Sequence, residues 1–212
     1  MRVKIGILAL QGAFREHRLA LERLGAETRE VRLPAQLDGL DGLIVPGGES
    51  STMAKLATAY GFDVALPAFH AAGGSIFGTC AGAILLAREI EGRPYQLRLG
   101  LIDLTVARNA YGRQIASFEA DLNVRGLDAP FRAVFIRAPR IAAAGPDATV
   151  LARWRGDPVA VTQGRVMVAV FHPELSGNDA FHRLFLDSVA AHAASGADAR
   201  RPTGPHPSSD RA

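Results

Sequence analysis

Short apolar runs alternate with amphipathic segments through the first half of the sequence, and few folds accommodate that order. Runs typical of strands occupy residues 3–10, 27–33, 40–45 and 75–77. Helical patterns occupy residues 14–24, 50–60, 63–72 and 81–89, and Ser50 or Ser51 is expected to cap the second of them. Strands that alternate with helices at this pace predict an α/β fold with a mostly parallel sheet and helices on both of its faces.

The second half of the sequence has a different character, with many strand-like stretches and few helices between them. These stretches occupy residues 101–106, 117–122, 133–136, 149–154, 158–162 and 166–170. A final helix is predicted at residues 181–191. Some of these strands must extend the central sheet or add an antiparallel edge to it.

The chain is long enough for one packed domain, which we assign to residues 1–192. Of its 212 residues, 48% are hydrophobic. Two domains of half this length would each be marginally stable, because small domains bury a smaller share of their surface. Residues 193–212 are rich in Pro, Ser and Gly and lack large apolar side chains, so this C-terminal tail is predicted to be disordered.

Charge and cysteine content exclude several classes of protein. The net charge is +3 and the basic residues are scattered, which argues against a nucleic-acid partner. No apolar stretch approaches the length of a membrane span, and the apolar run at the N-terminus is too short for a signal peptide. The single cysteine, Cys80, excludes an internal disulfide and fits a reducing compartment. We therefore expect a soluble, cytoplasmic protein with no membrane partner.

Cys80 lies in a turn with the spacing of a nucleophile elbow. The segment Gly78–Gly82 reads Gly-Thr-Cys-Ala-Gly between a predicted strand and a predicted helix. Such a tight turn strains the backbone at its central residue and requires small residues beside it. The start of a helix favours the thiolate over the thiol, and the N–H of Ala81 would point towards a developing oxyanion. A buried structural cysteine is the alternative, which the elbow spacing disfavours.

His172 and Glu174 follow an apolar strand as His-Pro-Glu. Residues two apart in an extended segment point to the same side, so Glu174 can reach the imidazole of His172. A thiol nucleophile needs such a pair, because the histidine transfers the proton and the carboxylate fixes its tautomer. The other histidines lie on predicted helices or in the tail, where we interpret them as surface or satisfied core residues: His17, His70, His182, His192 and His206.

A glycine-containing loop, Pro-Gly-Gly-Glu-Ser-Ser-Thr at residues 46–52, follows the third predicted strand. Its glycines could bring backbone N–H groups close to a ligand or a reaction centre. A phosphate-binding P-loop is the alternative, but the Gly-Lys-Ser/Thr of that motif is absent. An ordinary turn is the remaining interpretation of the loop taken alone.

These three motifs, in this order, are similar to those of class I (triad) glutamine amidotransferases. Within that family the chain most resembles the glutaminase subunits of pyridoxal 5′-phosphate synthase. The resemblance covers roughly residues 3–192, and the ordered set of motifs is far more specific than any one of them. Further matching stretches are 8–12 with Glu16 and His17, 108–114 with 117–119, and 136–139.

Carried over residue by residue, the resemblance implies a role for each matching position. Cys80 is the implied nucleophile, His172 the base and Glu174 its orienter. The implied glutamine contacts are Gly47, Gly48, Glu49, Arg108, Ile136 and Arg137. Gln11 and Gly12 match a loop that, in the family, helps to form the oxyanion hole when the partner binds. Glutamine carries one carboxylate and one ammonium group, which agrees with a pocket that offers both a cation and an acceptor.

The resemblance also implies a fold, a reaction and a partner. The family fold is a flavodoxin-like three-layer sandwich. The implied reaction hydrolyses L-glutamine to L-glutamate and ammonia through a γ-glutamyl thioester, with no metal or organic cofactor. The ammonia would pass to a pyridoxal 5′-phosphate synthase subunit (PdxS type) in a large heteromeric complex.

Three other functions stay open on the sequence. A class I glutaminase of another pathway, such as histidine biosynthesis, would share the elbow and the His-x-Glu motif but is expected to lack the Ala-Leu-Gln-Gly start. A non-enzymatic binding module could use the same fold, because fold does not fix function. A cysteine hydrolase of the same shape would act on other amides or on esters.

Overall fold

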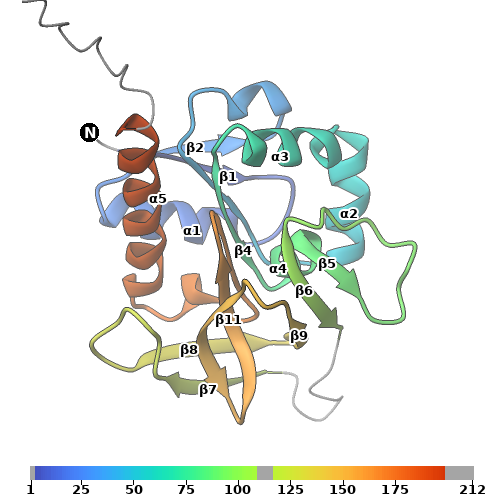
Figure 1. Cartoon of the computed structure of the whole chain (residues 1–212), viewed down its shortest axis with the longest axis vertical. Coiled ribbons are helices and arrows are strands. Elements are labelled where there is room, and N and C mark those ends of the chain that lie inside the picture. The colour runs from blue at the N-terminus through green and yellow to red at the C-terminus, as the bar shows by residue number, and fades with distance from the viewer. Residues whose placement is uncertain (1–2, 109–116, 199–212) are drawn as a thin grey trace, which may run out of the picture.

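The computed structural model describes residues 3–108 and 117–198, and a seven-stranded sheet forms its centre (Figure 1). The strands of this sheet are β1 (Lys4–Leu8), β2 (Glu27–Val31), β3 (Gly42–Val45), β4 (Ser75–Thr79), β10 (Thr149–Trp154), β11 (Asp157–Gln163) and β12 (Val166–Ala169). They lie in the order β10-β11-β12-β4-β3-β1-β2. The strands from β12 to β2 are parallel, whereas β11 and β10 add an antiparallel edge.

This strand order confirms the predicted α/β fold with a mostly parallel sheet. The chain runs outward from β1 to β2 in one direction and then from β3 through β4 to β12 in the other. That is the order of a flavodoxin-like sheet, in which ligands bind at the carboxyl ends of the strands, near the switch in direction. β3 and β4 are buried along their whole length because layers of helices cover both faces.

Helices cover the two faces of the sheet and complete a three-layer sandwich (Figure 1). The helices are α1 (Phe14–Arg23), α2 (Ser50–Ala59), α3 (Phe62–Ala71), α4 (Ala81–Leu86) and α5 (Ala180–Asp198), with short 3₁₀ helices η1 (Pro34–Leu37) and η2 (Pro173–Leu175). α1 and α5 pack together on one face, and α2 contacts α3 and α4 on the other. Within the described ranges, no helix combines the length and the apolar character that a bilayer span requires.

Two smaller sheets flank the central one. One contains β5 (Ala87–Ile90), β6 (Ile102–Ala107) and β9 (Arg140–Ala144), and the other is the hairpin of β7 (Ser117–Leu122) and β8 (Phe131–Ile136). The prediction of a helix at 81–89 was wrong at its end, because the chain leaves α4 after Leu86 and pairs with β6. β9 was not predicted, since its Ala-rich sequence lacks the pattern of a strand and its pairing with β6 is antiparallel and long-range.

The last helix is longer than the sequence pattern indicated. α5 continues to Asp198, so the prediction that the disordered tail begins at residue 193 was wrong for residues 193–198. Alanine is the best helix former, and the alanines of this segment extend the helix although large apolar residues have ended. Residues 199–212 lie outside the described part of the chain, so their disorder stays a prediction.

Aromatic side chains fill the core directly behind the end of β12. Phe171 contacts Phe181 of α5 with ring centroids 5.2 Å apart, and Phe135 of β8 with ring centroids 5.5 Å apart. Phe181 also stacks on Phe77 of β4, at 5.8 Å. Phe171 is fully buried, so the residue after it, His172, leaves the sheet from a closely packed support.

Candidate active site

Four loops meet at the carboxyl edge of the parallel strands, and all the candidate catalytic residues lie on or next to them. Gln11 and Gly12 follow β1, the segment 47–49 follows β3, Cys80 follows β4, and His172 follows β12. β12 and β4 are neighbours in parallel register, with Ala169 opposite Thr79. This register brings Cys80 and His172 together, although they lie 92 positions apart in the chain.

Cys80 has the strained backbone of a nucleophile elbow. Its φ is +47° and its ψ is −102°, a combination that side chains rarely adopt. Its N–H donates to the carbonyl of Ala169 over 2.8 Å, which holds the turn against β12. A Cβ on Gly78 would lie 2.8 Å from the carbonyl carbon of Gly82, and one on Gly82 would collide with the Val45 carbonyl. The two flanking glycines therefore meet a steric requirement of this turn.

His172 and Glu174 form a buried pair at the start of η2. Nδ1 of His172 lies 2.8 Å from Oε1 of Glu174, and the two residues are 8% and 9% exposed. The backbone N–H of His172 donates to the carbonyl of Val134 over 2.8 Å, so β8 fixes the position of the base. With Nδ1 bound to the carboxylate, Nε2 is the nitrogen left to face Cys80.

The charges around His172 favour its protonated form. Burial alone would lower its pKa, but the interactions with Cys80 and with the Glu174 carboxylate outweigh burial and raise the pKa to about 10. For Glu174 the balance is similar: burial opposes ionisation, while His17 and His172 keep the pKa of the carboxyl below its usual value. The site therefore stabilises a charged imidazolium beside an ionised carboxylate.

Gly47 lies beside both Cys80 and His172. A Cβ at this position would lie 2.5 Å from Cε1 of His172 and 3.2 Å from Cβ of Cys80. Both distances are shorter than ordinary carbon–carbon contacts of about 3.5–4.0 Å. The absence of a side chain at Gly47 therefore leaves room for the side chains of Cys80 and His172.

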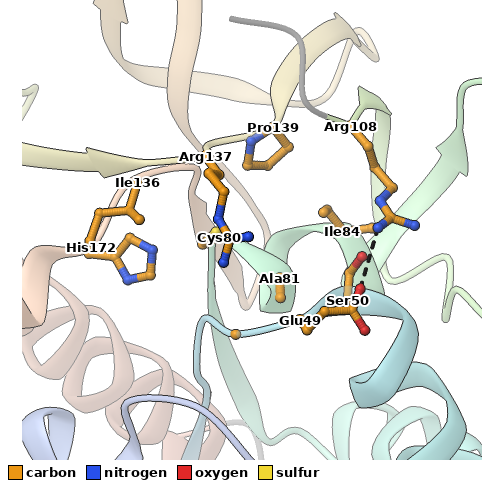
Figure 2. Close-up of a pocket in the computed structure, with 11 residues that line it drawn as sticks. Glu49, Ser50, Cys80, Ala81, Ile84, Arg108, Ile136, Arg137, Pro139 and His172 are labelled. Atoms are coloured by element: carbon orange, nitrogen blue, oxygen red, sulfur yellow. Dashed lines mark hydrogen bonds and ion pairs between the residues drawn. The ribbon is translucent and has the colours of Figure 1, made fainter. Parts of the chain in front are cut away.

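A pocket of about 240 Å³ opens above Cys80 (Figure 2). Eight of the predicted site residues line it: Gly48, Glu49, Cys80, Ala81, Arg108, Ile136, Arg137 and His172. Its volume is below the ~300–1,000 Å³ typical of sites for drug-sized ligands, so it suits a metabolite of amino-acid size. Figure 2 shows His172 on one side of the pocket and Arg108 on the other, with Arg137 extending towards Cys80.

Glu49 and Arg108 form the polar end of this pocket. The carboxylate of Glu49 caps α2, accepting the N–H groups of Ser51 at 3.0 Å and Thr52 at 2.7 Å, and Nη2 of Arg108 lies 3.4 Å away. The N–H of Ser51, the Thr52 hydroxyl and the other donors lower the pKa of Glu49 to about 2. The prediction that Ser50 or Ser51 caps α2 was wrong, because the longer side chain of Glu49 reaches the same N–H groups from one residue earlier.

Gln11 and Gly12 are close to the pocket but do not line it. The side-chain amide of Gln11 donates to the Glu49 carbonyl at 2.9 Å, and its oxygen accepts the N–H of Glu49 at 3.3 Å. Gly12 has a φ of +86° and packs against the Gly47 carbonyl, where any Cβ would collide. Residues 109–114 of the matching stretch that begins at Arg108 lie outside the described residues.

Several side chains at the site were not singled out from the sequence. Ser50, Ile84 and Pro139 also line the pocket. Ser50 follows Glu49 directly, and Ile84 lies three residues after Ala81 on one helix, so spacing could have indicated both. His17 approaches Glu174 to 3.3 Å; it lies in a stretch that matches the family, but it was interpreted as a surface or satisfied core residue. Among the described residues, no group of three or more His, Cys, Asp or Glu side chains is arranged to hold a metal.

Comparison with known proteins gives a consistent set of matches. The model of the SNO glutamine amidotransferase family matches residues 7–191. The pyridoxal 5′-phosphate synthase subunit PdxT of Deinococcus radiodurans is 59% identical over 186 residues, which cover 86% of this chain and 95% of that protein. The PdxT of Thermus thermophilus is 55% identical over 188 residues, covering 88% of this chain and 98% of the relative.

Solved structures extend the match to three dimensions. A crystal structure of a glutamine amidotransferase superposes with a TM-score of 0.84 at 51% identity, over 88% of this chain and 98% of that one. The structure of PurLQS from Thermotoga maritima superposes with a TM-score of 0.66 at 18% identity, over 93% of this chain and 100% of that one. The second match shows a shared fold and no more, because its sequence identity is low.

Proposed function

The chain belongs to the SNO glutamine amidotransferase family, and on that premise we propose that Cys80, His172 and Glu174 form its catalytic triad. The chain is a glutaminase that hydrolyses L-glutamine to L-glutamate and ammonia, as the glutaminase subunit of pyridoxal 5′-phosphate synthase. Its partner is the PdxS-type synthase subunit, which consumes the ammonia. The two subunits assemble into a large heteromeric complex in the cytoplasm, a compartment that keeps the thiol of Cys80 reduced.

One observation carries the assignment of the triad. A cysteine in a strained strand-to-helix turn faces a histidine whose second nitrogen lies 2.8 Å from a buried carboxylate. A structural cysteine requires neither the strain nor the neighbouring His–Glu pair. A thiol nucleophile requires both, because the strained turn presents the sulfur to the substrate and the pair moves the proton.

The geometry supports a two-step hydrolysis. The sulfur of Cys80 attacks the γ-carboxamide carbon of glutamine, and Nε2 of His172 gives its proton to the departing nitrogen, which leaves as ammonia. A water molecule then attacks the γ-glutamyl thioester, His172 accepts a proton from that water, and the thiolate and glutamate are released. Glu174 holds the proton on Nδ1 of His172 throughout.

The two ends of the pocket suit the two ends of glutamine. The γ-amide must reach Cys80, so the α-carbon and its charges extend towards Arg108 and Glu49 on the far side (Figure 2). We assign the α-carboxylate to the guanidinium of Arg108 and the α-ammonium group to the carboxylate of Glu49, which remains ionised. Gly47, Gly48, Ile136 and Arg137 supply the remaining contacts in this proposal.

The oxyanion of each tetrahedral intermediate needs hydrogen-bond donors. Ala81 begins α4 directly after Cys80, and the first N–H groups of a helix have no partner within that helix. Gln11 and Gly12 provide the second contribution in this proposal, after the synthase binds. In the free chain Gln11 is bonded to the backbone of Glu49, so this contribution requires the loop to change its conformation.

The proposal is tested by measuring ammonia release from L-glutamine with a saturating PdxS-type subunit. Wild-type chain is expected to be active, and Cys80→Ser inactive but folded, because His172 would have to activate a much less acidic group. A glutamine-analogue electrophile such as 6-diazo-5-oxo-L-norleucine is expected to label Cys80, as seen by peptide mass spectrometry. Near-normal ammonia release by Cys80→Ser would overturn the assignment of the nucleophile.

A further inference from the structure

The carboxylate of Glu174 has one oxygen that the catalytic triad does not use. Oε1 binds His172, whereas Oε2 is buried and has no hydrogen bond of good geometry among the described residues. His17 of α1 approaches it, with Nε2 of the imidazole 3.3 Å from Oε2. Both side chains are fully buried, so water cannot satisfy this oxygen from outside.

His17 itself belongs to a small polar cluster beneath the nucleophile. Its Nε2 is 3.2 Å from the hydroxyl of Thr79, the residue before Cys80, and its Nδ1 is 2.9 Å from Nε2 of His182. His182 lies on α5, which packs beside α1 on the same face of the sheet. The cluster therefore joins two helices to the strand end that carries Cys80.

One arrangement of protons accounts for the contacts of His17 in this cluster. Burial lowers the pKa of His17, and burial followed by the neighbouring His17 lowers the pKa of His182 to about 3, so both rings are neutral. A carboxylate only accepts hydrogen bonds, so a bond from His17 to Oε2 requires the proton on Nε2, where the Thr79 hydroxyl oxygen, 3.2 Å away, shares it. Nδ1 of His17 then accepts from Nε2 of His182. The remaining nitrogen, Nδ1 of His182, then carries no proton, and it has no hydrogen-bond partner within residues 3–108 and 117–198.

We propose that His17 is a positioning residue for glutamine hydrolysis, donating from Nε2 to Oε2 of Glu174 and so holding the carboxylate in the orientation that binds His172. This inference rests on the triad proposed above. The terminal torsion of a glutamate side chain has a broad energy profile, so a carboxylate held through one oxygen can rotate. A second tether on the other oxygen removes that freedom and keeps Oε1 in line with Nδ1 of His172.

A buried histidine can also be a core residue with satisfied polar atoms, and matched variants separate the two roles. Gln places its amide nitrogen where a histidine has Nε2, so His17→Gln keeps a donor to Glu174. Asn reaches only as far as Nδ1, so His17→Asn stays polar but loses that donor. His17→Leu removes every polar contact of the side chain. Leu21→Ala is the control for stability, because Leu21 is buried on the same helix.

The variants are compared by ammonia release with a saturating PdxS-type subunit, and by thermal unfolding. His17→Asn and His17→Leu are expected to lower kcat about tenfold, the value of one hydrogen bond to a charged group, with KM nearly unchanged. His17→Gln is expected to recover most of the loss. Leu21→Ala is expected to lower Tm and leave kcat unchanged. If His17→Leu fails to fold, the comparison of kcat between His17→Asn and His17→Gln tests the positioning role by itself.

A double-mutant cycle tests the connection to Glu174. Once Glu174→Ala has removed the carboxylate, His17→Asn is expected to cause no further loss of kcat, because its partner is gone. An equal loss in both backgrounds would overturn the proposal, as would wild-type kcat in His17→Asn. A kcat of His17→Gln as low as that of His17→Asn would overturn it as well.

A measurement that does not use glutamine can test the role of His17 independently of the proposed glutaminase activity. The rate at which iodoacetamide alkylates Cys80 reports the thiolate that His172 stabilises. Slower alkylation in His17→Asn than in His17→Gln would support the positioning role even if the wild-type chain released no ammonia. Equal alkylation rates in the two variants and the wild type would count against it, whatever the outcome of the glutaminase assay.

Discussion

A methyl group on Gly47 tests whether catalysis depends on the close approach of nucleophile and base. The added Cβ would lie 2.5 Å from Cε1 of His172 and 3.2 Å from Cβ of Cys80. Because carbon atoms in contact are about 3.5–4.0 Å apart, the imidazole would have to retreat by about 1 Å. A misplacement of about 1 Å can cost about 10²-fold in rate. We therefore expect Gly47→Ala to lower kcat about 10²-fold, or about 2.7 kcal/mol of transition-state stabilisation.

The imidazole cannot retreat without losing other contacts. Its Nδ1 is held 2.8 Å from Glu174, and the backbone of His172 is held 2.8 Å from the Val134 carbonyl. A shift of the ring must therefore lengthen the bond to the carboxylate or displace the end of β12. Either change moves Nε2 away from the sulfur, which is the reason to expect the loss in kcat rather than in substrate binding.

The assay is glutamate formation with a saturating PdxS-type subunit, with kcat, KM and Tm measured for each variant. Gly73→Ala is the matched control, because Gly73 has a φ of +101° and open space around the position of a Cβ. It is expected to cost about 1 kcal/mol of stability through its backbone and to leave kcat unchanged. A wild-type kcat for Gly47→Ala, or an equal loss of kcat for Gly73→Ala, would refute the reasoning.

Three further predictions concern the base, the helix cap and the tail. Glu174→Ala is expected to retain a kcat roughly a hundredfold higher than that of His172→Ala, because Glu174 orients the base but transfers no proton. Equal losses of kcat in the two folded variants would indicate another role for Glu174. Glu49→Gln is expected to cost about 1 kcal/mol of stability at neutral pH by weakening the cap of α2. Because folding lowers the pKa of Glu49 from 4.5 to about 2, the stabilisation is present above pH 4.5 and lost as the pH falls towards 2. Urea unfolding at a series of pH values should therefore show that the unfolding free energies of the wild type and of Glu49→Gln converge in acid. A difference between the two free energies that does not change with pH would contradict this. Deletion of residues 199–212 is expected to leave Tm and kcat unchanged, since the segment has no large apolar residue to bury, and a clear drop in Tm would show that it packs.

Local sequence patterns predicted most helices and strands of the fold, and the predictions were wrong where long-range strand pairing decided the structure. The strands predicted in the first half of the sequence all form, because short apolar runs between turns encode them directly. Residues 87–89 were predicted as the end of a helix, yet they belong to strand β5, because β6 offers them a partner. Pairing partners are distant in sequence, so no local pattern indicates them.

The candidate catalytic residues could be predicted from the sequence for the same reason as the first strands, because local patterns encode both. The elbow around Cys80 and the pair of His172 and Glu174 are local motifs, whose spacing states what each residue can reach. Arg108 and Ile136 entered only through the resemblance to a family, and both line the pocket. Composition and spacing gave no independent reason to select them.

The sequence by itself determined the class of fold and the candidate reacting groups, since both are encoded in patterns a few residues long. Only the tertiary structure decided how these groups are held. It placed Gly47 between nucleophile and base, assigned the cap of α2 to Glu49, and brought His17 to the second oxygen of Glu174. His17 and its partner His182 are 165 residues apart in the chain, and their contact exists because α1 and α5 pack on one face of the sheet. Such contacts depend on the packing of whole elements, which no local spacing records.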